Sequence, residues 1–340
     1  MFVDIILLIV GLALILVGAN CLTDGASSIA KRLGISELVV GLTIVAFGTS
    51  APELVISVMS AMKNNAGLAI GNVVGSNIFN ILGIVGCVAI VRPIKIEKSI
   101  MTNEIPLMVL SSFAMLACAN GVLLNNQPEN LITRSDGILL LLFFLIFMRY
   151  TASIAKDAAN EPVSEAPQNA SMASSADDST VECTAKTSQS TIKSILFVIG
   201  GLAALIWGGE LFVDNASAIA SSLNVSDAVI GLTIVALGTS LPELATSLVA
   251  AVKGQTGIAV GNVIGSFLFN IFLVLGVSAT IHPLTMGGIT NVDLLVMTGS
   301  AVLFWLTGWL IKKRTITRGE GILMVVVYVA YTAWLIANAA

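Results

Sequence analysis

The stretch GLTIVAFGTSAPEL, residues 41–54, returns almost unchanged as GLTIVALGTSLPEL, residues 231–244. Each copy places one glutamate, Glu53 or Glu243, inside an apolar segment long enough to cross a membrane. A charged side chain at the centre of a bilayer costs at least about 2.5 kcal/mol, so two at equivalent positions predict an ion site. A purely structural hydrogen bond at both positions is the alternative interpretation.

The composition around these segments indicates an integral membrane protein. The chain has 340 residues, of which 56% are hydrophobic and 11% charged, and its mean hydropathy is +0.97. Soluble domains are only about half apolar. Ten apolar stretches are mostly long enough to cross about 30 Å of hydrocarbon. They cover roughly 5–22, 38–62, 67–91, 104–120, 136–152, 193–213, 228–252, 257–281, 292–311 and 319–337.

The placement of basic residues predicts the orientation. If residue 1 lies outside, 14 of the 16 Lys and Arg residues fall on the cytoplasmic side, and only Lys63 and Arg134 fall outside. The positive-inside bias therefore predicts external termini, in a protein of the cell membrane, plasma or inner. The net charge of −4 says little about partners, and no basic nucleic-acid surface or nucleotide-binding glycine loop is found.

The two similar stretches belong to a larger internal repeat. At an offset of 190, about 29 of the 55 positions from Val39 to Pro93 are identical to their counterparts. The repeated unit holds five predicted helices, and because five is odd the second copy must enter the bilayer from the opposite face. We therefore expect an all-α integral membrane protein with ten transmembrane helices, arranged as two inverted five-helix repeats, 1–155 and 193–340.

The segment between the repeats, 156–192, is predicted to be a disordered cytoplasmic linker. It is rich in Ser, Ala, Thr and Asn, contains Pro162 and Pro167, and has few large apolar residues. Its acidic side chains favour a solvated linker, with weak cation sensing as the alternative. It is too short for a folded regulatory domain of ordinary size.

The first motif, Gly-Thr-Ser-x-Pro-Glu, should interrupt its helix in both repeats. Proline removes a backbone donor and glycine loosens the turn, so nearby carbonyls are expected to be released as oxygen ligands. Thr and Glu of the motif are four apart and share a helix face, with Ser adjacent. These positions are Gly48, Thr49, Ser50, Pro52 and Glu53, then Gly238, Thr239, Ser240, Pro242 and Glu243, with carbonyls around Ala46, Phe47, Ala236 and Leu237.

The second motif, GNVVGSNIFN at 71–80 and GNVIGSFLFN at 261–270, lies on the next helix. Its glycines, Gly71, Gly75, Gly261 and Gly265, form small-xxx-small pairs that allow close helix approach. A hydroxyl and an amide four residues apart face one side, Ser76 with Asn80 and Ser266 with Asn270. Asn72 and Asn262 lie on a different face, where ligand support and interhelical bonding are equally open.

Together these groups predict an oxygen cage, the set of hydroxyl, amide, carbonyl and carboxylate oxygens of the two motifs. It contains no imidazole or thiolate, so its cargo should be a hard cation such as Ca²⁺ or Na⁺ rather than a transition metal. Two carboxylates would balance one divalent ion. The four cysteines show no metal-ligand spacing and are expected to be small packing residues.

The paired GTSxPE and GNxxGSxxFN motifs resemble the alpha repeats of the calcium/cation antiporter superfamily, in particular its sodium/calcium exchanger family. The resemblance spans the chain. It implies exchange of cytoplasmic Ca²⁺ for external Na⁺ without a cofactor, with Glu53 and Glu243 as central ligands and Asn80 and Asn270 completing the site. It further implies flanking Na⁺ ligands at Thr49, Ser50, Ser76, Thr239, Ser240 and Ser266 and at the carbonyls of Ala46 and Ala236.

The resemblance also carries expectations about coupling. Some relatives have Asp where this chain has Asn270, and in the potassium-dependent branch that acid is associated with K⁺, so we expect potassium independence. Three Na⁺ per Ca²⁺ would make exchange electrogenic. A Ca²⁺/H⁺ antiporter of the same fold is the main alternative, because buried glutamates also bind protons. A cation channel is a second alternative, and an enzyme is disfavoured because no nucleophile and base pair lies at membrane depth.

Several other polar residues are more simply interpreted as solvated or helix-capping groups than as ion ligands. Asp24, Glu210 and Asp214 lie near predicted helix ends, where solvation or capping is a simpler interpretation than ion ligation. The single histidine, His282, precedes Pro283 and is expected to be a solvated boundary residue rather than a pH sensor. The bound partners predicted are therefore inorganic cations and the lipid bilayer, with no nucleic acid; protein partners are not indicated.

Overall fold

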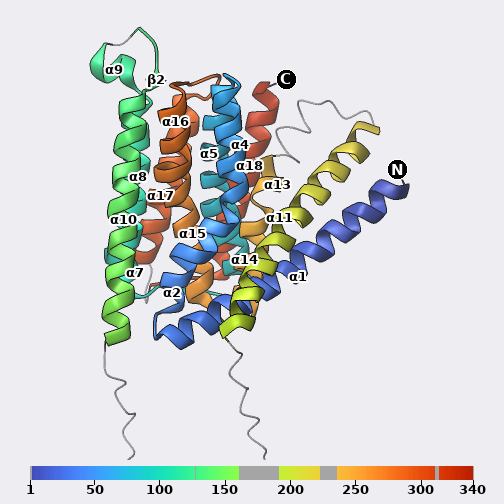
Figure 1. The fold of residues 1–340 in the computed structure, drawn as a ribbon. Helices are drawn as coiled ribbons and strands as arrows, with labels where there is room; N and C mark the ends of the chain where they lie inside the picture. Colours follow the sequence, from blue (N-terminus) through green and yellow to red (C-terminus); the bar gives the residue numbers. More distant parts are fainter. Residues whose placement is uncertain (1, 127, 161–190, 223–235, 311–313, 340) are drawn as a thin grey trace, which may run out of the picture.

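The computed structural model describes residues 2–126, 128–160, 191–222, 236–310 and 314–339, and these are almost entirely helical (Figure 1). The elements of the first repeat are α1 Phe2–Leu33, α2 Glu37–Val40, η1 Gly41–Val45, α3 Ala46–Thr49, α4 Ala51–Met62, α5 Ala66–Ile78, η2 Phe79–Val85, α6 Gly86–Val91, β1 Ile94–Lys95, α7 Lys98–Thr102, α8 Glu104–Cys118, α9 Gly121–Asn125, β2 Leu131–Ile132 and α10 Arg134–Asn160.

The second repeat follows a similar order, with the single helix α17 where the first repeat has α7 and α8. Its described elements are α11 Thr191–Ser222, α13 Ala236–Thr239, α14 Leu241–Val252, α15 Thr256–Phe269, η4 Asn270–Leu275, α16 Gly276–Ile281, β3 Leu284–Thr285, α17 Asn291–Leu310, β4 Thr315–Ile316 and α18 Arg318–Ala339. The η elements are π-helical turns, which are rare and concentrate at functional sites. Two of them, η2 and η4, occupy equivalent positions at the end of the second motif.

The helices confirm a multi-pass membrane protein. Eight helices of the described part are long and apolar enough to cross a membrane, and the pair Glu37–Thr49 and Ala51–Met62, bent by 46°, makes a ninth span. The remaining predicted span, 228–252, lies partly outside the described residues, and its described part is α13 and α14. The predicted all-helical membrane fold is therefore confirmed.

The chain ends lie at the opposite end of the molecule from the two helix ends that flank the predicted linker. In Figure 1 the two termini are at the top, whereas α10 ends and α11 begins at the bottom. α10 continues to Asn160 and α11 begins at Thr191, so both helices extend slightly into the predicted linker 156–192. Residues 161–190 lie outside the described residues, and their disorder stays a prediction. We call the two ends the termini side and the linker side.

Burial separates a central layer from a lipid-facing layer. In the most apolar windows of α5–α6 and α15–α16, which carry the second motif, 83% and 94% of residues are buried. In α10 and α18 the shares are only 17% and 11%, and these helices expose large apolar side chains as a bilayer requires. The second motif therefore lies in the centre of the protein.

Helices α1 and α11 pack as an antiparallel pair that crosses the rest of the bundle at an incline (Figure 1). Glycines allow the contact: a Cβ built at Gly18 would lie 2.7 Å from the Gly201 carbonyl oxygen, and one at Gly11 would lie 2.8 Å from that of Gly208. Gly25 lies against Ser194 in the same register. Small residues every seven positions thus bring the two backbones together.

Two short ladders connect the repeats at their loops, and they were not predicted from the sequence. Strand β1 pairs with β4, with Ile94 opposite Ile316, and β2 pairs with β3, with Ile132 opposite Leu284. Each ladder joins a loop of the first repeat to a loop of the second. The repeats are therefore interlocked rather than placed side by side.

Candidate cation site

A helix break in each repeat positions the two glutamates. α3 ends at Thr49 and α4 begins at Ala51, with Ser50 between them at φ −83° and ψ 6°; Ser240 has φ −93° and ψ 8°. Proline follows in the first turn of α4 and of α14, where its missing N–H is tolerated. Glu53 and Glu243 therefore lie at helix N-termini, whose partial positive charge favours an anion.

The two breaks meet, and each one bonds to the carboxylate of the other repeat. Ser50 Oγ donates to Glu243 Oε1 at 3.2 Å, and Ser240 Oγ donates to Glu53 Oε1 at 3.3 Å. Both glutamates are 1% exposed. The structure thus brings together the residues that the repeated first motif singled out.

The second motif surrounds this pair. Ser76 Oγ lies 3.1 Å from Ser240 Oγ, and Ser266 lies beside the Glu243 carboxylate. Thr49 Oγ1 donates to Asn262 Oδ1 at 3.1 Å, so the first repeat also contacts the second motif of the other repeat. Thr239, the counterpart of Thr49, lies on α13 at the second break.

Asn72 and Asn262 each donate hydrogen bonds to the neighbouring helix that carries a site glutamate. Asn72 Nδ2 donates to the Glu53 carbonyl at 3.2 Å and to Ser57 Oγ at 2.9 Å. Asn262 Nδ2 makes the equivalent bonds to the Glu243 carbonyl at 3.4 Å and to Ser247 Oγ at 3.0 Å. These bonds satisfy carbonyls at the start of α4 and α14 and fix both glutamates against the neighbouring helix.

Several buried oxygens of the cage have no hydrogen-bond partner among the described residues. They are Glu53 Oε2, Glu243 Oε2, Asn80 Oδ1, Asn270 Oδ1 and Ser266 Oγ. No described Lys, Arg or His side chain forms an ion pair with either glutamate. Buried polar atoms are normally satisfied, so a cluster of unsatisfied acceptors beside two carboxylates matches the ligand set of a hard cation.

The backbone at the first break differs from the expectation of released carbonyls. The Ala46 carbonyl accepts the Ser50 amide at 3.0 Å and also lies 3.4 Å from Thr49 Oγ1. In the second repeat the Leu237 carbonyl accepts the Ser240 amide at 3.2 Å. The expected release is therefore wrong for these two carbonyls, because the chain bends while keeping local turn bonds. A carbonyl oxygen has a second lone pair, which leaves room for an ion.

The glycines of the motifs differ in what they touch. A Cβ at Gly261 would lie 2.6 Å from the Leu38 carbonyl oxygen, and one at Gly265 would lie 2.6 Å from Ala46 Cβ, so both permit close helix packing as predicted. Gly71 has only Ile289 Cδ1 at 3.4 Å, and Gly75 has no described atom within 4 Å. The repeat counterparts of Leu38, Gly41 and Leu42, which lie against Gly261 and Gly265, are positions 228, 231 and 232, outside the described residues. Gly48 and Gly238 both pack against α11.

One site residue that the sequence did not single out is Asn77. It is fully buried, and its Oδ1 accepts a hydrogen bond from Asn270 Nδ2 at 3.1 Å. The available signal was an asymmetry: the second motif reads GSN in the first repeat and GSF in the second. A polar residue that breaks an otherwise well-matched repeat indicates a position where the two halves differ in their contacts.

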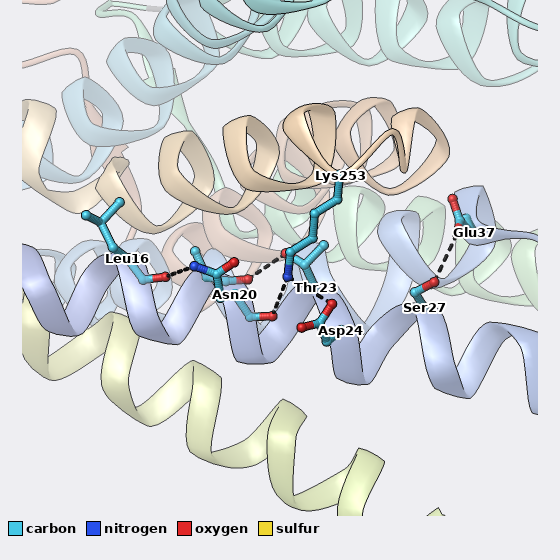
Figure 2. Close-up of polar contacts among 8 residues, drawn as sticks. Leu16, Asn20, Thr23, Asp24, Ser27, Glu37 and Lys253 are labelled. Carbon is cyan, nitrogen blue, oxygen red and sulfur yellow. Dashed lines mark hydrogen bonds and ion pairs between the residues drawn. The ribbon is translucent and has the colours of Figure 1, made fainter. Parts of the chain in front are cut away.

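Asp24 is 44% exposed, in line with its expected solvation, and it also forms an ion pair that was not predicted. Its Oδ1 forms an ion pair with Lys253 Nζ at 2.9 Å, and Lys253 also donates to the Asn20 carbonyl at 3.2 Å (Figure 2). Ser27 Oγ on the same helix donates to Glu37 Oε1 at 3.0 Å, so α1 is tied to two neighbouring elements (Figure 2). The ion pair was missed because its residues are 229 positions apart.

The remaining polar residues agree with their simpler interpretations. His282 is exposed, with Nδ1 2.8 Å from the Pro283 carbonyl oxygen. Cys21, Cys87 and Cys118 are free, and Cys183 lies outside the described residues. Within the described ranges, no group of three or more His, Cys, Asp or Glu side chains could hold a metal ion.

The fold and site define a class: membrane transporters built from inverted repeats, with polar groups gathered where the repeats meet. Comparison with known proteins gives the family. The family model described as sodium/calcium exchanger protein matches residues 3–152 and 193–337, which lie within the two predicted repeats. The chain belongs to the sodium/calcium exchanger family. It is therefore an antiporter and not an enzyme, and the ions of this family are cargo rather than cofactors.

Relatives of similar length support this assignment. The chain is 35% identical over 335 residues to the inner membrane protein YrbG of Escherichia coli, covering 97% of this chain and 96% of YrbG. It is 32% identical over 352 residues to the sodium/calcium exchanger MaX1 of Methanosarcina acetivorans, covering 97% of each. It also matches the solved sodium-calcium exchanger NCX_Mj with a TM-score of 0.78 and 32% identity, over 98% of this chain and 99% of that one. The ten-helix inverted repeat fits that fold.

Proposed function

We propose that the chain exchanges Ca²⁺ for Na⁺ by alternating access, with Glu53 and Glu243 as the shared central ligands. The observation that carries this proposal is the reciprocal pairing, in which Ser50 bonds to Glu243 and Ser240 bonds to Glu53 while each Oε2 stays unpartnered. Two buried negative charges need compensation in a low dielectric. One Ca²⁺ supplies it, and so does a group of Na⁺ ions at the same oxygens.

Competition for these oxygens would produce the coupling. Ca²⁺ needs six to eight oxygens at 2.3–2.6 Å in proteins generally, so it would engage both carboxylates at once. Several Na⁺ ions would use the same carboxylates. Their other ligands would be the hydroxyls of Thr49, Ser50, Ser76, Thr239, Ser240 and Ser266 and the carbonyls of Ala46 and Ala236. The two cargoes then exclude each other, and exchange needs no covalent step. Asn80 and Asn270 would complete the Ca²⁺ site.

The shape of the protein supports access from one side in this conformation. A cavity of about 340 Å³ is lined by Val55 and Ile56 of α4, Glu210 and Asp214 of α11, and Thr239 at the second break. Val55 is 61% exposed, whereas its repeat counterpart Ala245 is 9% exposed, and Thr246, the counterpart of Ile56, is fully buried. The site is thus approached from the termini side, while the equivalent linker-side surface is covered.

An ion pair accompanies the covered side. Asp24 on α1 and Lys253 at the end of α14, here called the linker-side latch, join the inclined α1–α11 pair to the rest of the bundle (Figure 2). The repeat counterparts are Asp214 and Lys63, here called the termini-side pair; both are exposed and they are not paired with each other. Inverted symmetry then suggests that the alternate conformation opens the latch and closes the termini-side pair.

Purified protein in sealed liposomes would test the proposed exchange. With Na⁺ trapped inside and the pH gradient collapsed by an ionophore, an outward Na⁺ gradient should drive accumulation of radiolabelled Ca²⁺. Accumulation that requires Na⁺ supports the proposal. Accumulation that follows only a pH gradient would establish the Ca²⁺/H⁺ alternative, which the same unpaired carboxylates would also serve. A current that persists with no counter-ion on the opposite side would indicate a channel. K⁺ should be dispensable.

A further inference from the structure

The amide of Asn77 has a fixed orientation in the structure. Its Nδ2 lies 3.4 Å from the backbone carbonyl oxygen of Phe267 and 3.9 Å from Met297 Sδ. A carbonyl oxygen accepts hydrogen bonds but cannot donate them, so the nitrogen of Asn77 must face Phe267. The oxygen of Asn77 therefore faces the other way, toward Asn270.

This orientation in turn fixes Asn270. The oxygen of Asn77 can only accept, so Asn270 must present its Nδ2, and the two atoms lie 3.1 Å apart. The Oδ1 of Asn270 is then the free atom, and it is buried without a hydrogen-bond partner. Asn270 stands one helical turn after Ser266, which lies beside the Glu243 carboxylate.

The first repeat lacks the equivalent arrangement. Asn80 is the counterpart of Asn270, and neither its Oδ1 nor its Nδ2 has a hydrogen-bond partner among the described residues. The residue that corresponds to Asn77 in the second repeat is Phe267, whose ring has no amide to offer. The orientation of the Asn80 amide is therefore not set in the way that the orientation of Asn270 is.

We infer that Asn77 is a positioning residue, which holds Asn270 with its carbonyl oxygen available to a bound cation. The inference rests on the proposed function, because it concerns the same oxygen cage. A cation is attracted to an amide oxygen and repelled by an amide N–H₂ group, so a preset oxygen favours binding. The two repeats are consequently unequal: the second supplies an oriented oxygen, and the first supplies an amide that the ion itself must orient.

The test compares Asn77→Leu with the matched variant Phe267→Leu at the counterpart position, using full-length protein in liposomes. Removing one hydrogen bond of about 1 kcal/mol corresponds to about fivefold in an equilibrium constant. Asn77→Leu should therefore raise the apparent KM for Ca²⁺ about fivefold with little change in maximal rate. Phe267→Leu should leave the KM unchanged. Ca²⁺ titration calorimetry on purified protein should show the same difference in affinity without transport.

A second background separates positioning from a general structural role. In Asn270→Asp the two side-chain oxygens are identical, so no orientation is needed. In that background Asn77 Oδ1 faces a carboxylate oxygen and has no donor to accept from, so adding Asn77→Leu should leave the KM for Ca²⁺ unchanged or lower it, whereas a structural role would raise it about fivefold in both backgrounds. Asn77→Ala carries the same expectations and serves if the leucine variant does not fold.

The outcomes distinguish this inference from the proposed function. If the wild-type protein exchanges Ca²⁺ for Na⁺ but Asn77→Leu matches it in KM and affinity, the positioning role is overturned alone. An equal loss in both backgrounds would overturn it as well. If the wild-type protein neither binds Ca²⁺ nor transports it, both proposals fail.

Discussion

The linker-side latch leads to a prediction about the balance between the two access states. Replacing Lys253 by Met removes the ion pair with Asp24 and the hydrogen bond to the Asn20 carbonyl, which are present in the conformation described and which the proposed alternation would break. The alternate conformation, open on the linker side, should therefore become more populated. Replacing Lys63 by Met should act in the opposite direction, because Lys63 is the expected partner of Asp214 in the alternate conformation.

The size of the effect follows from exposure. The side chains of Lys253 and Asp24 are 24% and 44% exposed and their charged atoms are 2.9 Å apart, so water screens the pair. Exposed ion pairs contribute about 0.2–1 kcal/mol. With the additional hydrogen bond, we expect a total near 1 kcal/mol, which is about a fivefold shift in the equilibrium between the two states.

Chemical labelling on the linker side would measure this shift. Thr246 is fully buried here, but its repeat counterpart Ile56 lines the termini-side cavity, so Thr246 should become accessible in the alternate state. In a background without native cysteines, a Thr246→Cys protein should react with an impermeant maleimide at a rate proportional to the population of that state. Lys253→Met should raise the rate about fivefold.

Three results would refute this reasoning. The first is an unchanged labelling rate in Lys253→Met. The second is an increase in Lys63→Met, which should instead slow labelling. The third is failure of the charge-exchanged double variant, Asp24→Lys with Lys253→Glu, to bring the rate back toward the wild-type value. An Ile56→Cys protein labelled from the termini side is the matched control, and its rate should change little because that state is already the populated one.

Three further predictions follow from the site and the packing. Glu53→Gln should nearly abolish radiolabelled Ca²⁺ uptake by removing half of the buried charge, while Glu165→Gln in the linker should transport normally. Gly261→Ala should lower the free energy of unfolding by about 1–3 kcal/mol, because its methyl group would meet a backbone carbonyl at 2.6 Å. Gly200→Ala is the control and should not lower it, since no described atom lies within 4 Å of the added methyl group. Thermal unfolding in detergent compares the two variants. With three Na⁺ per Ca²⁺, each 100 mV should change the equilibrium Ca²⁺ gradient about 50-fold, measurable in vesicles with a K⁺ diffusion potential.

Repetition made the centre of the fold predictable. A motif that occurs twice at one offset supports the same assignment twice. Glu53 and Glu243 could therefore be predicted to form one site from the sequence alone. Parity of the helix count then gave the inverted arrangement, because a unit with five crossings must reverse its direction. The serines adjacent to the glutamates were also found in this way, but their bonding across the repeats was not, since it depends on how the halves face each other.

The missed features are those in which the repeats differ or meet at long range. Asn77 has no counterpart amide, so a search for repeated residues passed over it. The ion pair between Asp24 and Lys253 joins residues far apart in the chain, and each one alone resembles an ordinary helix-end charge. The Ala46 carbonyl was expected to be free because proline interrupts helices, yet the bend keeps a bond from Ser50. Local rules predicted the break but not its remaining bonds.

The glycine contact between α1 and α11 has the geometry of a homodimer interface within a single chain. Gly11 and Gly201 are repeat counterparts, as are Gly18 and Gly208, and the contacts join Gly11 to Gly208 and Gly18 to Gly201. Each half therefore offers the same patch to the other, related by a twofold axis, which defines an isologous interface. Such a surface is complementary to itself. The pairing of the two halves is therefore determined by the patch that each five-helix unit carries, and not by the peptide that connects them.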